Sequence, residues 1–195
     1  MARVTDPQKL DRIRACTMDL IVRNGFAGIT IAAVAEKAGV SVGYLYRHYA
    51  GKDELVTDLV VQNFETLRQT VTGMLAQSES VAAVVRYYLT QLFILAEQEP
   101  VKARFISVLF RDVRFREIAR GKRLLNIPEV AASLLAKGRA TGEIREDVTV
   151  PEVMLFLLNL PLDYIFVNLE EAQPSPAFTE AHIHRLTAMC LKGLG

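Results

Sequence analysis

Hydrophobic positions recur every three to four residues along almost the whole chain of 195 residues, which is the period of an amphipathic α-helix. Residues typical of helix ends divide this pattern into segments. Asp6 and Pro7 suit a helix start, and Asn24 and Gly25 suit a helix end. No segment alternates apolar and polar residues with the two-residue period of a half-buried strand. The pattern therefore predicts an all-α protein of about nine helices, three short ones followed by six longer ones.

The three short helices are closely spaced. Thr30 is suited to cap a helix over 31–38, and Ser41 is suited to cap another over 42–49. Only three residues separate the two, and one of them is Gly39. Two short helices joined by such a turn are typical of a helix-turn-helix. We therefore expect a three-helix helix-turn-helix head over residues 1–52. A C-terminal helical bundle is expected over residues 53–195, with helices over about 52–76, 81–98, 100–112, 114–141 (kinked at Pro128), 151–169 and 177–193.

The charge of the chain is unevenly distributed. The net charge is only +1. Residues 1–52 carry eight basic and four acidic side chains, a balance of +4 that leaves −3 for residues 53–195. A basic head on a mildly acidic body indicates that the head meets an anion, although a solvated basic face would look the same.

The cysteines and the apolar segments bear on the compartment. Cys16 and Cys190 lie near opposite ends and form no motif, so we expect buried free thiols rather than a disulfide. The N-terminal sequence has no apolar signal-peptide core. The most apolar run, residues 153–167, is interrupted by polar residues and a proline and is too short to span a bilayer. These features predict a cytoplasmic protein with no membrane partner.

The second helix of the helix-turn-helix, VGYLYRHY, is rich in rings and cations. Leu45 and Tyr49 share one helix face and should pack inward. Phosphate oxygens accept hydrogen bonds from Tyr hydroxyls, His N–H groups and free amides at a helix start. Ser41 and Gly43 let the backbone come close at the end of the helix that enters a major groove. These residues indicate double-stranded DNA as the partner, and ordinary surface positions of a bundle are the alternative. The remaining candidates on this helix are Tyr44, Tyr46, Arg47 and His48.

The TetR family of bacterial transcriptional regulators has a helix-turn-helix signature that this chain resembles over residues 30–55, TIAAVAEKAGVSVGYLYRHYAGKDEL. The elements T-I-x-x-V-A-x-x-A-G-V-S, L-Y-R-H-Y and G-K-D-E-L keep the spacing of the signature across three helices, and the preceding NGFAGITI also matches. The resemblance covers residues 10–60, and beyond residue 60 only the length and the helix count agree. It implies a homodimeric, ligand-responsive regulator, expected to be a repressor, that binds a pseudo-palindromic operator.

The resemblance also implies which residues contact the DNA backbone. Thr30 and Lys52 resemble the phosphate-contacting residues that begin the second and fourth helices. Tyr46 and His48 resemble the ring residues with which the family clamps phosphates.

Base contacts are expected at the first turn of the second helix. Val42, Gly43 and Tyr44 fall where the family touches bases. Val42 and Gly43 offer no side-chain hydrogen bond to a base edge, so thymine methyl groups, Tyr44 and DNA shape should carry more of the specificity. Arg47 could reach either a phosphate or a base.

The body should provide a dimer interface. The helix over 151–169 is apolar nearly all round, so we expect it to be buried both by the core of its own chain and by a partner chain. In the TetR family the last two helices pair with their copies in a four-helix interface, and a core within one chain is the alternative. Two heads on a palindrome also double the contact with DNA. The residues expected at the interface are Phe156, Leu157, Leu160, Tyr164, Leu186 and Met189.

The body is also rich in rings. Bodies of this kind in the TetR family hold a cavity for a small effector, so the resemblance implies an apolar or aromatic effector. Rings at this spacing also fit an ordinary core. The residues expected to line the cavity are Tyr87, Tyr88, Gln91, Arg104, Phe105 and Asn159.

No pattern indicates catalysis or a metal site. His182 and His184 are two residues apart on a predicted helix, so they point to different faces and cannot share one ion. The sequence shows no Ser-His-acid set, phosphate-binding loop or paired carboxylates. We therefore expect no enzyme, cofactor or metal. The alternative to a regulator is a helical small-molecule binding protein without operator function, and salt-sensitive binding to a defined operator separates the two.

Overall fold

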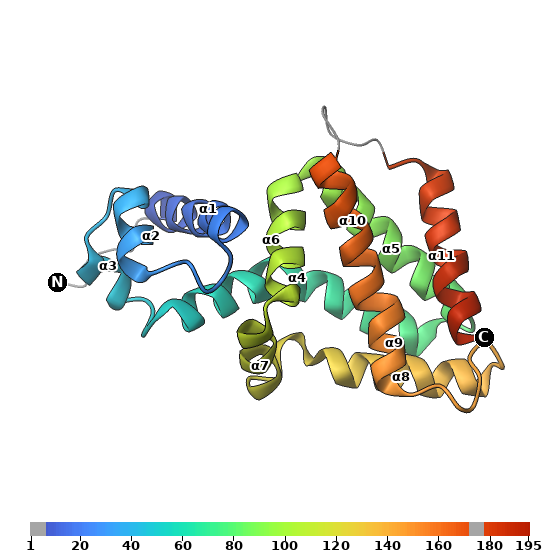
Figure 1. Cartoon of the computed structure of the whole chain (residues 1–195). Coiled ribbons are helices and arrows are strands. Elements are labelled where there is room, and N and C mark those ends of the chain that lie inside the picture. Colours follow the sequence, from blue (N-terminus) through green and yellow to red (C-terminus); the bar gives the residue numbers. More distant parts are fainter. Residues whose placement is uncertain (1–6, 172–177) are drawn as a thin grey trace.

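The computed structural model describes residues 7–171 and 178–195, and every regular element among them is a helix (Figure 1). The expectation of an all-α chain is therefore confirmed. Asp6 and most of the loop expected before the last helix lie outside the described residues. The elements are α1 (Pro7–Asn24), α2 (Ile31–Ala38), α3 (Val42–Tyr46), α4 (Lys52–Gln77), α5 (Val81–Gln98), α6 (Pro100–Arg111), α7 (Val113–Gly121), the 3-10 turn η1 (Leu124–Asn126), α8 (Ile127–Ala140), α9 (Val150–Met154), the π turn η2 (Leu155–Asn159), α10 (Leu160–Glu171) and α11 (Glu180–Leu194).

The helices form a head and a body joined by one long helix. Figure 1 shows α1–α3 at one end, α5–α11 at the other, and α4 running from the head into the body. Helix α6 packs against α1 of the head and against α5 and α10 of the body. Helix α11 packs along α5 at the far end. The head therefore contacts the body through α6 as well as through α4.

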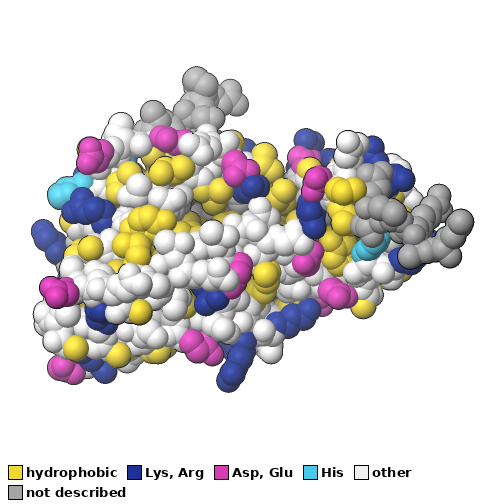
Figure 2. All heavy atoms as spheres, turned by 180° about the vertical axis from the view of Figure 1, so that it is seen from behind, with side chains coloured by type: hydrophobic (Ala, Val, Ile, Leu, Met, Phe, Trp, Pro, Cys, Tyr) yellow, Lys and Arg dark blue, Asp and Glu magenta, His cyan; other side chains and the backbone are white. Residues whose placement is uncertain are grey.

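Buried apolar residues form three clusters along the molecule. One lies within the head around Val34 and Leu45, and the largest lies within the body. The middle one, here called the junction cluster, takes residues from both parts: Ile21, Phe26 and Ile29 from the head, Val56, Leu59, Val60 and Phe64 from α4, and Phe105, Ile106, Leu109, Phe115, Leu124 and Leu162 from the body. The boundary expected at residue 52 thus coincides with the start of α4, but the packing is continuous across it. Figure 2 shows that apolar side chains also reach the surface of the molecule between scattered charges.

Three helices differ from the expected boundaries. Helix α3 ends at Tyr46, so the rings at 48 and 49 lie in the following turn. The helix expected over 114–141 is divided before Pro128, because Arg123, Leu125 and Asn126 adopt positive φ angles of 48°, 56° and 46°. Non-glycine residues pay a steric cost in this left-handed region, and such residues often lie near ligand sites.

The helix expected over 151–169 contains a π turn. Pro161 has no N–H, so the bond to Leu157 O that an α-helix would make is missing. The backbone instead widens by one residue, and Leu160 N–H donates to Leu155 O. The wider turn changes which side chains share a face on either side of it.

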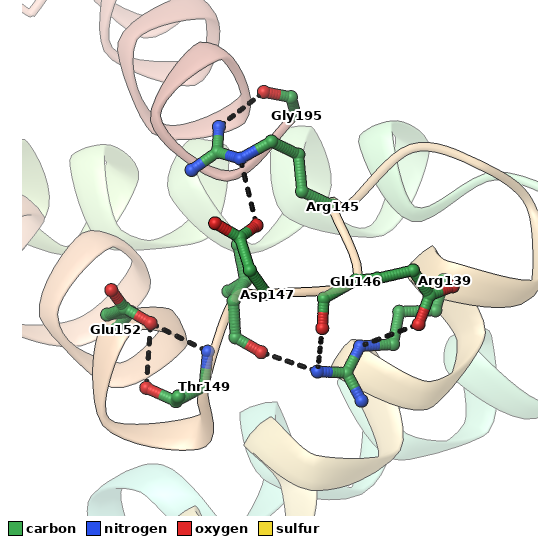
Figure 3. A network of polar contacts seen from close by, with 8 residues as sticks. Arg139, Arg145, Glu146, Asp147, Thr149, Glu152 and Gly195 are labelled. Carbon is green, nitrogen blue, oxygen red and sulfur yellow. Dashed lines mark hydrogen bonds and ion pairs between the residues drawn. The ribbon is translucent and has the colours of Figure 1, made fainter.

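The loop between α8 and α9 is held by side chains rather than by regular structure (Figure 3). Arg139 Nη2 donates to Glu146 O at 2.6 Å and to Val148 O at 2.7 Å. Arg145 Nη1 donates to Gly195 O at 2.6 Å, which ties this loop to the end of α11. At the start of α9, Thr149 and Glu152 form a capping box.

Glu143 joins the same loop to the start of α5. Its carboxylate accepts from Val81 N–H and Ala82 N–H, both at 2.8 Å, from Ser80 Oγ at 3.1 Å and from Thr141 Oγ1 at 2.8 Å. Burial alone would raise the pKa of Glu143, but these hydrogen bonds outweigh it and hold the pKa below the usual value. The charged form of Glu143 is therefore favoured by the folded state.

We predict that Glu143→Gln lowers the free energy of unfolding by on the order of 1 kcal/mol at neutral pH, because a neutral amide accepts fewer and weaker hydrogen bonds. A depressed pKa in the folded state gives stability that is present above the unfolded-state pKa and is lost as the pH falls through the folded-state pKa. The difference between wild type and variant in urea unfolding should therefore shrink in acid. Glu146→Gln, at an exposed position of the same loop, is the control. A difference that persists below the folded-state pKa would contradict the role of the charge.

Candidate nucleic-acid interface and apolar cavity

Two capping side chains and one glycine set the geometry of the helix-turn-helix. Thr30 Oγ1 accepts from Ala33 N–H at 3.1 Å, and Ser41 Oγ accepts from Tyr44 N–H at 3.2 Å. Gly39 ends α2 with φ 67° and ψ 38°, the left-handed conformation that favours glycine at a helix C-terminus. Both caps are exposed, so the starts of α2 and α3 face solvent, and each cap hydroxyl keeps its own proton for an outside acceptor.

Helix α3 and the turn after it have one buried and one exposed side. Leu45 is fully buried and Tyr49 nearly so, and Tyr49 Oη donates to Asp58 Oδ2 at 3.2 Å. Val42 is 40% exposed and Tyr46 57% exposed, and both are among the most exposed large apolar side chains of the protein. Arg47 is also exposed. Valine and tyrosine at this exposure leave much of their apolar surface in water, which makes the outer side of α3 a candidate contact surface.

Gly43 lies on that exposed side without a structural need for glycine. Its φ angle is not positive, and a Cβ added there would have no atom within 4 Å. A helical glycine costs roughly 0.5–1 kcal/mol relative to alanine. Neither the fold nor the backbone conformation requires glycine here, and its missing side chain leaves room for the close approach of a partner.

Tyr44 is placed differently from the expectation that it reads bases. Its ring is half-buried against the head cluster, and its hydroxyl is buried without a hydrogen-bond partner in the described residues. The Arg47 guanidinium lies 5.4 Å from the ring centroid of Tyr44, and the His48 ring lies 4.9 Å from it. Tyr44 therefore supports Arg47 and His48 in this structure and does not present its hydroxyl to an outside group.

Lys52, which is expected to contact a phosphate, lies against the head in this structure. Its ammonium group donates to Phe26 O at 3.1 Å, Ile29 O at 3.3 Å and Ala27 O at 3.5 Å, all in the turn between α1 and α2. It also lies 4.8 Å from the centroid of the Phe26 ring. The head itself satisfies this lysine.

The body contains an apolar cavity of about 150 Å³. It is lined by α4, α5, α6, the segment around η1, α8 and the α9–α10 helix. Leu125 and Ile127, which lie in or beside the left-handed segment, form part of its wall. All the lining side chains are apolar except Tyr88 and Arg68: Phe64, Leu67, Arg68, Val71, Val84, Val85, Tyr88, Leu92, Ile106, Phe110, Leu125, Ile127, Val130, Ala131, Leu134, Val153, Met154, Leu157, Leu158 and Leu162.

The two polar lining residues differ in their bonding. The guanidinium of Arg68 is paired with Glu65, and Arg68 Nε donates to Glu65 Oε2 at 2.8 Å. Tyr88 makes no hydrogen bond in the described part of the chain, and burial, with the nearby Cys190 as the smaller cause, raises the pKa of Tyr88 far above its usual value. Cys190 itself donates to Phe156 O, and burial raises its pKa to about 11. The otherwise apolar wall thus includes one neutral tyrosine whose hydroxyl is unpaired among the described residues.

Of the six residues expected to line the cavity, the structure places only Tyr88 there. Tyr87 and Gln91 lie on a neighbouring stripe of α5, because the cavity side of that helix is formed by Val84, Tyr88 and Leu92. The other three lie outside the lining as well: Arg104 donates to Leu169 O, Phe105 is fully buried in the junction cluster, and Asn159 is half-buried in the π turn.

The expected dimer residues divide into two groups. Leu157 and Leu186 are buried within their own chain, and Leu157 lines the cavity, so they are core residues. Phe156, Leu160 and Tyr164 are half-buried, and Met189 is 57% exposed. Leu155 and Val167, which are 52% and 43% exposed, are not among the residues expected at the interface, although Val167 lies on the predicted apolar face of its helix.

The stretch Val150–Leu169 is long and apolar enough to cross a membrane by composition alone, and only 28% of it is buried in the chain. The same property describes a helix that is covered on one side by its own core and left open on the other. Among the described residues no group of His, Cys, Asp and Glu side chains has the arrangement of a metal site, and His182 instead caps α11 by accepting from Thr179 N–H at 3.1 Å.

The head is similar in sequence to known regulatory proteins. Residues 13–59 match the model of the bacterial regulatory proteins of the tetR family. The nucleoid occlusion factor SlmA of Aliivibrio fischeri is 28% identical over 120 residues, which cover 60% of this chain and 61% of SlmA. The chain thus spans about six tenths of the length of the curated relatives that it matches first.

Solved structures share the fold over nearly the whole chain. A TetR-family transcription regulator from Shewanella sp. PV-4 superposes with a TM-score of 0.74 at 19% identity and covers 95% of this chain and 97% of its own. The regulator FadR from Bacillus subtilis, solved in complex with stearoyl-CoA, has a TM-score of 0.71 at 14% identity and covers 95% of this chain and 99% of its own. At these identities the likeness concerns the fold.

Proposed function

The chain belongs to the TetR family of bacterial regulatory proteins, and we propose that it is a cytoplasmic transcriptional repressor that binds operator DNA as a homodimer and is released by an apolar effector. The observation that carries the DNA-binding part is the exposed side of α3, where Val42 and Tyr46 are 40% and 57% exposed and Gly43 has open space around it. A helix of this kind enters the major groove by its N-terminal end.

Roles in the head follow from what each side chain has free. Thr30, Ser41 and Tyr46 present hydroxyl groups at the surface, which suits phosphate oxygens. Arg47 is exposed and adds a positive charge, and His48 lies half-buried beside it. Val42 and Gly43 then face the bases, where an apolar side chain suits a thymine methyl group and the missing side chain permits close approach.

We predict that Gly43→Ala stabilises the protein and weakens its binding to DNA. Alanine should raise the free energy of unfolding by roughly 0.5–1 kcal/mol, because it favours the helix and meets no neighbour. The same methyl group should clash with a base pair and lower affinity for a duplex that the wild-type protein selects from a random-sequence pool. Thermal unfolding and fluorescence anisotropy measure the two effects. Gly73→Ala, also in open space but on α4, is the control and should leave affinity unchanged. If the wild-type protein selects no duplex, the alternative of a binding protein without operator function holds.

The dimer is proposed from the uncovered apolar side of the last helices. Leu155, Val167 and Met189 are about half exposed, and Phe156 and Leu160 are partly so. These side chains lie on α9–α10 and α11, which supports pairing of the two helices with their copies in a second chain. Burying these apolar side chains against a second chain would stabilise the dimer, because it removes apolar surface from water.

We predict that Leu155→Arg and Met189→Arg convert a dimer into a folded monomer, because an unpaired charge is placed in an interface but not in the core of the chain. Sedimentation velocity reports the size, and circular dichroism reports the fold. Val113→Arg, at an exposed valine on α7, is the matched control and should remain dimeric. Variants that keep the wild-type sedimentation coefficient would place the interface elsewhere. Leu157→Arg, by contrast, should unfold the chain.

The effector is proposed to be an acyl-CoA thioester whose hydrocarbon chain fills the cavity. The nearly uniform apolar wall supports a hydrocarbon chain, and the unpaired hydroxyl of Tyr88 supports one hydrogen-bond acceptor such as a thioester carbonyl. That the fold is shared with a regulator solved with stearoyl-CoA makes this class the first to test.

We predict that dodecanoyl-CoA binds the protein and lowers its affinity for the selected duplex by about 5–150-fold, and that the duplex lowers affinity for dodecanoyl-CoA by the same factor. Calorimetry with and without saturating duplex measures both. Tyr88→Phe should weaken the binding of dodecanoyl-CoA by roughly 1 kcal/mol, the net value of one hydrogen bond. Tyr87→Phe, one residue away but off the cavity, should not. Equal affinity for the thioester with and without DNA would exclude it as the signal.

A further inference from the structure

The contacts of Lys52 could not be predicted from the amino-acid sequence. An ammonium group has three N–H donors, and Lys52 Nζ has three carbonyl acceptors around it, Phe26 O, Ala27 O and Ile29 O, at 3.1–3.5 Å. The Phe26 ring lies beneath the same group. The side chain is half-buried, and these contacts direct its ammonium group into the turn between α1 and α2.

The local structure favours this arrangement over an outward one. Lys52 is the first residue of α4, and the positive end of the helix dipole disfavours a cation there. The turn after α1 offers carbonyl oxygens instead. It passes so close to the end of α1 that a Cβ at Gly28 would lie 2.4 Å from Asn24 O. Gly28 therefore permits the tight turn that directs three carbonyls at the lysine.

The contact continues into the body through aromatic rings. Phe26 meets Phe115 edge-on with ring centroids 5.5 Å apart, and Phe115 meets Phe110 at 5.9 Å. Phe26 and Phe115 are almost completely buried, so neither ring can shift without moving its neighbour. Phe110 lines the apolar cavity. A row of packed side chains thus runs from the cavity wall to Lys52.

We propose that Lys52 is a positioning residue that sets the orientation of the head on α4, and that Phe26, Phe115 and Phe110 connect this contact with the cavity. Lys52 does not contact DNA in this role. The proposal rests on the proposed function, because it concerns how the head is presented to DNA. It assigns to Lys52 a part in regulation in place of the phosphate contact that the family resemblance implies.

The two roles of Lys52 predict different salt dependence of DNA binding. Each phosphate contact contributes about 0.9 to the slope of log affinity against log salt concentration. Loss of a phosphate contact would lower the slope by about 0.9 for each head. Loss of a positioning contact would lower affinity at an unchanged slope, because the heads meet the DNA in a poorer orientation with all their phosphate contacts retained.

The test is Lys52→Met, which keeps the length and the apolar stem and removes the charge. Affinity for the duplex selected by the wild-type protein is measured over a range of salt concentrations, well below the melting temperature of each protein. We expect an unchanged slope with affinity lower by about 2–30-fold, the range found for residues that carry coupling. A slope lower by about 0.9 per head would overturn the proposal in favour of a phosphate contact. Unchanged affinity would overturn it in favour of a purely structural lysine.

Phe26→Leu and Phe115→Leu extend the test to the rings and replace it if Lys52→Met does not fold. Both should lower DNA affinity at unchanged slope although neither residue is charged or near the exposed side of α3. Phe105→Leu is the matched control, because Phe105 is fully buried in the same junction cluster but makes none of these ring contacts. Equal affinity for all three variants would overturn the role of the rings. Failure of the wild-type protein to bind any duplex would contradict the proposed function itself, and so the two failures are distinguishable.

Discussion

The structure depends on apolar packing that continues from the head into the body. Helices α2 and α3 have eight and five residues, too few to be stable by themselves in water. The head therefore needs a neighbour, and the junction cluster supplies one by placing Ile21, Phe26 and Ile29 against α4, α6 and α7. Because the same contacts stabilise the head and orient it, any change in the body that moves α6 or α4 changes how α3 is presented.

The cavity lowers the stability of the body, because the side chains around it are not fully packed. A void among Leu, Val and Phe side chains forfeits dispersion contacts, and its lining includes Tyr88, whose hydroxyl has no hydrogen-bond partner among the described residues. Leu125 and Ile127 reach its wall from a segment with three left-handed non-glycine residues. A cavity, an unpaired hydroxyl and a strained wall in one place are what a ligand that fills the space would relieve. Phe110, which lines the cavity, also packs against the junction cluster that connects the body with the head.

The surface of the body also has an apolar region that its own chain does not cover. The α9–α10 helix is apolar on both sides, and its own chain covers only one of them. The π turn at Leu155–Asn159 shapes this helix, because it brings Val153, Met154, Leu157 and Leu158 to the cavity and turns Leu155 outward. A single helix thus forms part of the cavity and part of the surface proposed for pairing, so the two are mechanically connected.

Local sequence determined the parts of this protein that depend on neighbouring residues. Helical periodicity predicts the all-α class, and Thr30, Gly39 and Ser41 act within three or four residues, so the helix-turn-helix could be placed from their spacing alone. The tertiary structure decided which groups the long side chains contact. Lys52 finds its acceptors 23 to 26 residues away in the chain, and Tyr44 and Leu157 turn into cores that no local pattern defines. The cavity wall could not be predicted either, because its residues come from six segments and the phase of each depends on turns such as 123–126 and 155–159. Helical periodicity predicts which residues share one face of a helix. Only the packing of all the helices together determines what that face contacts.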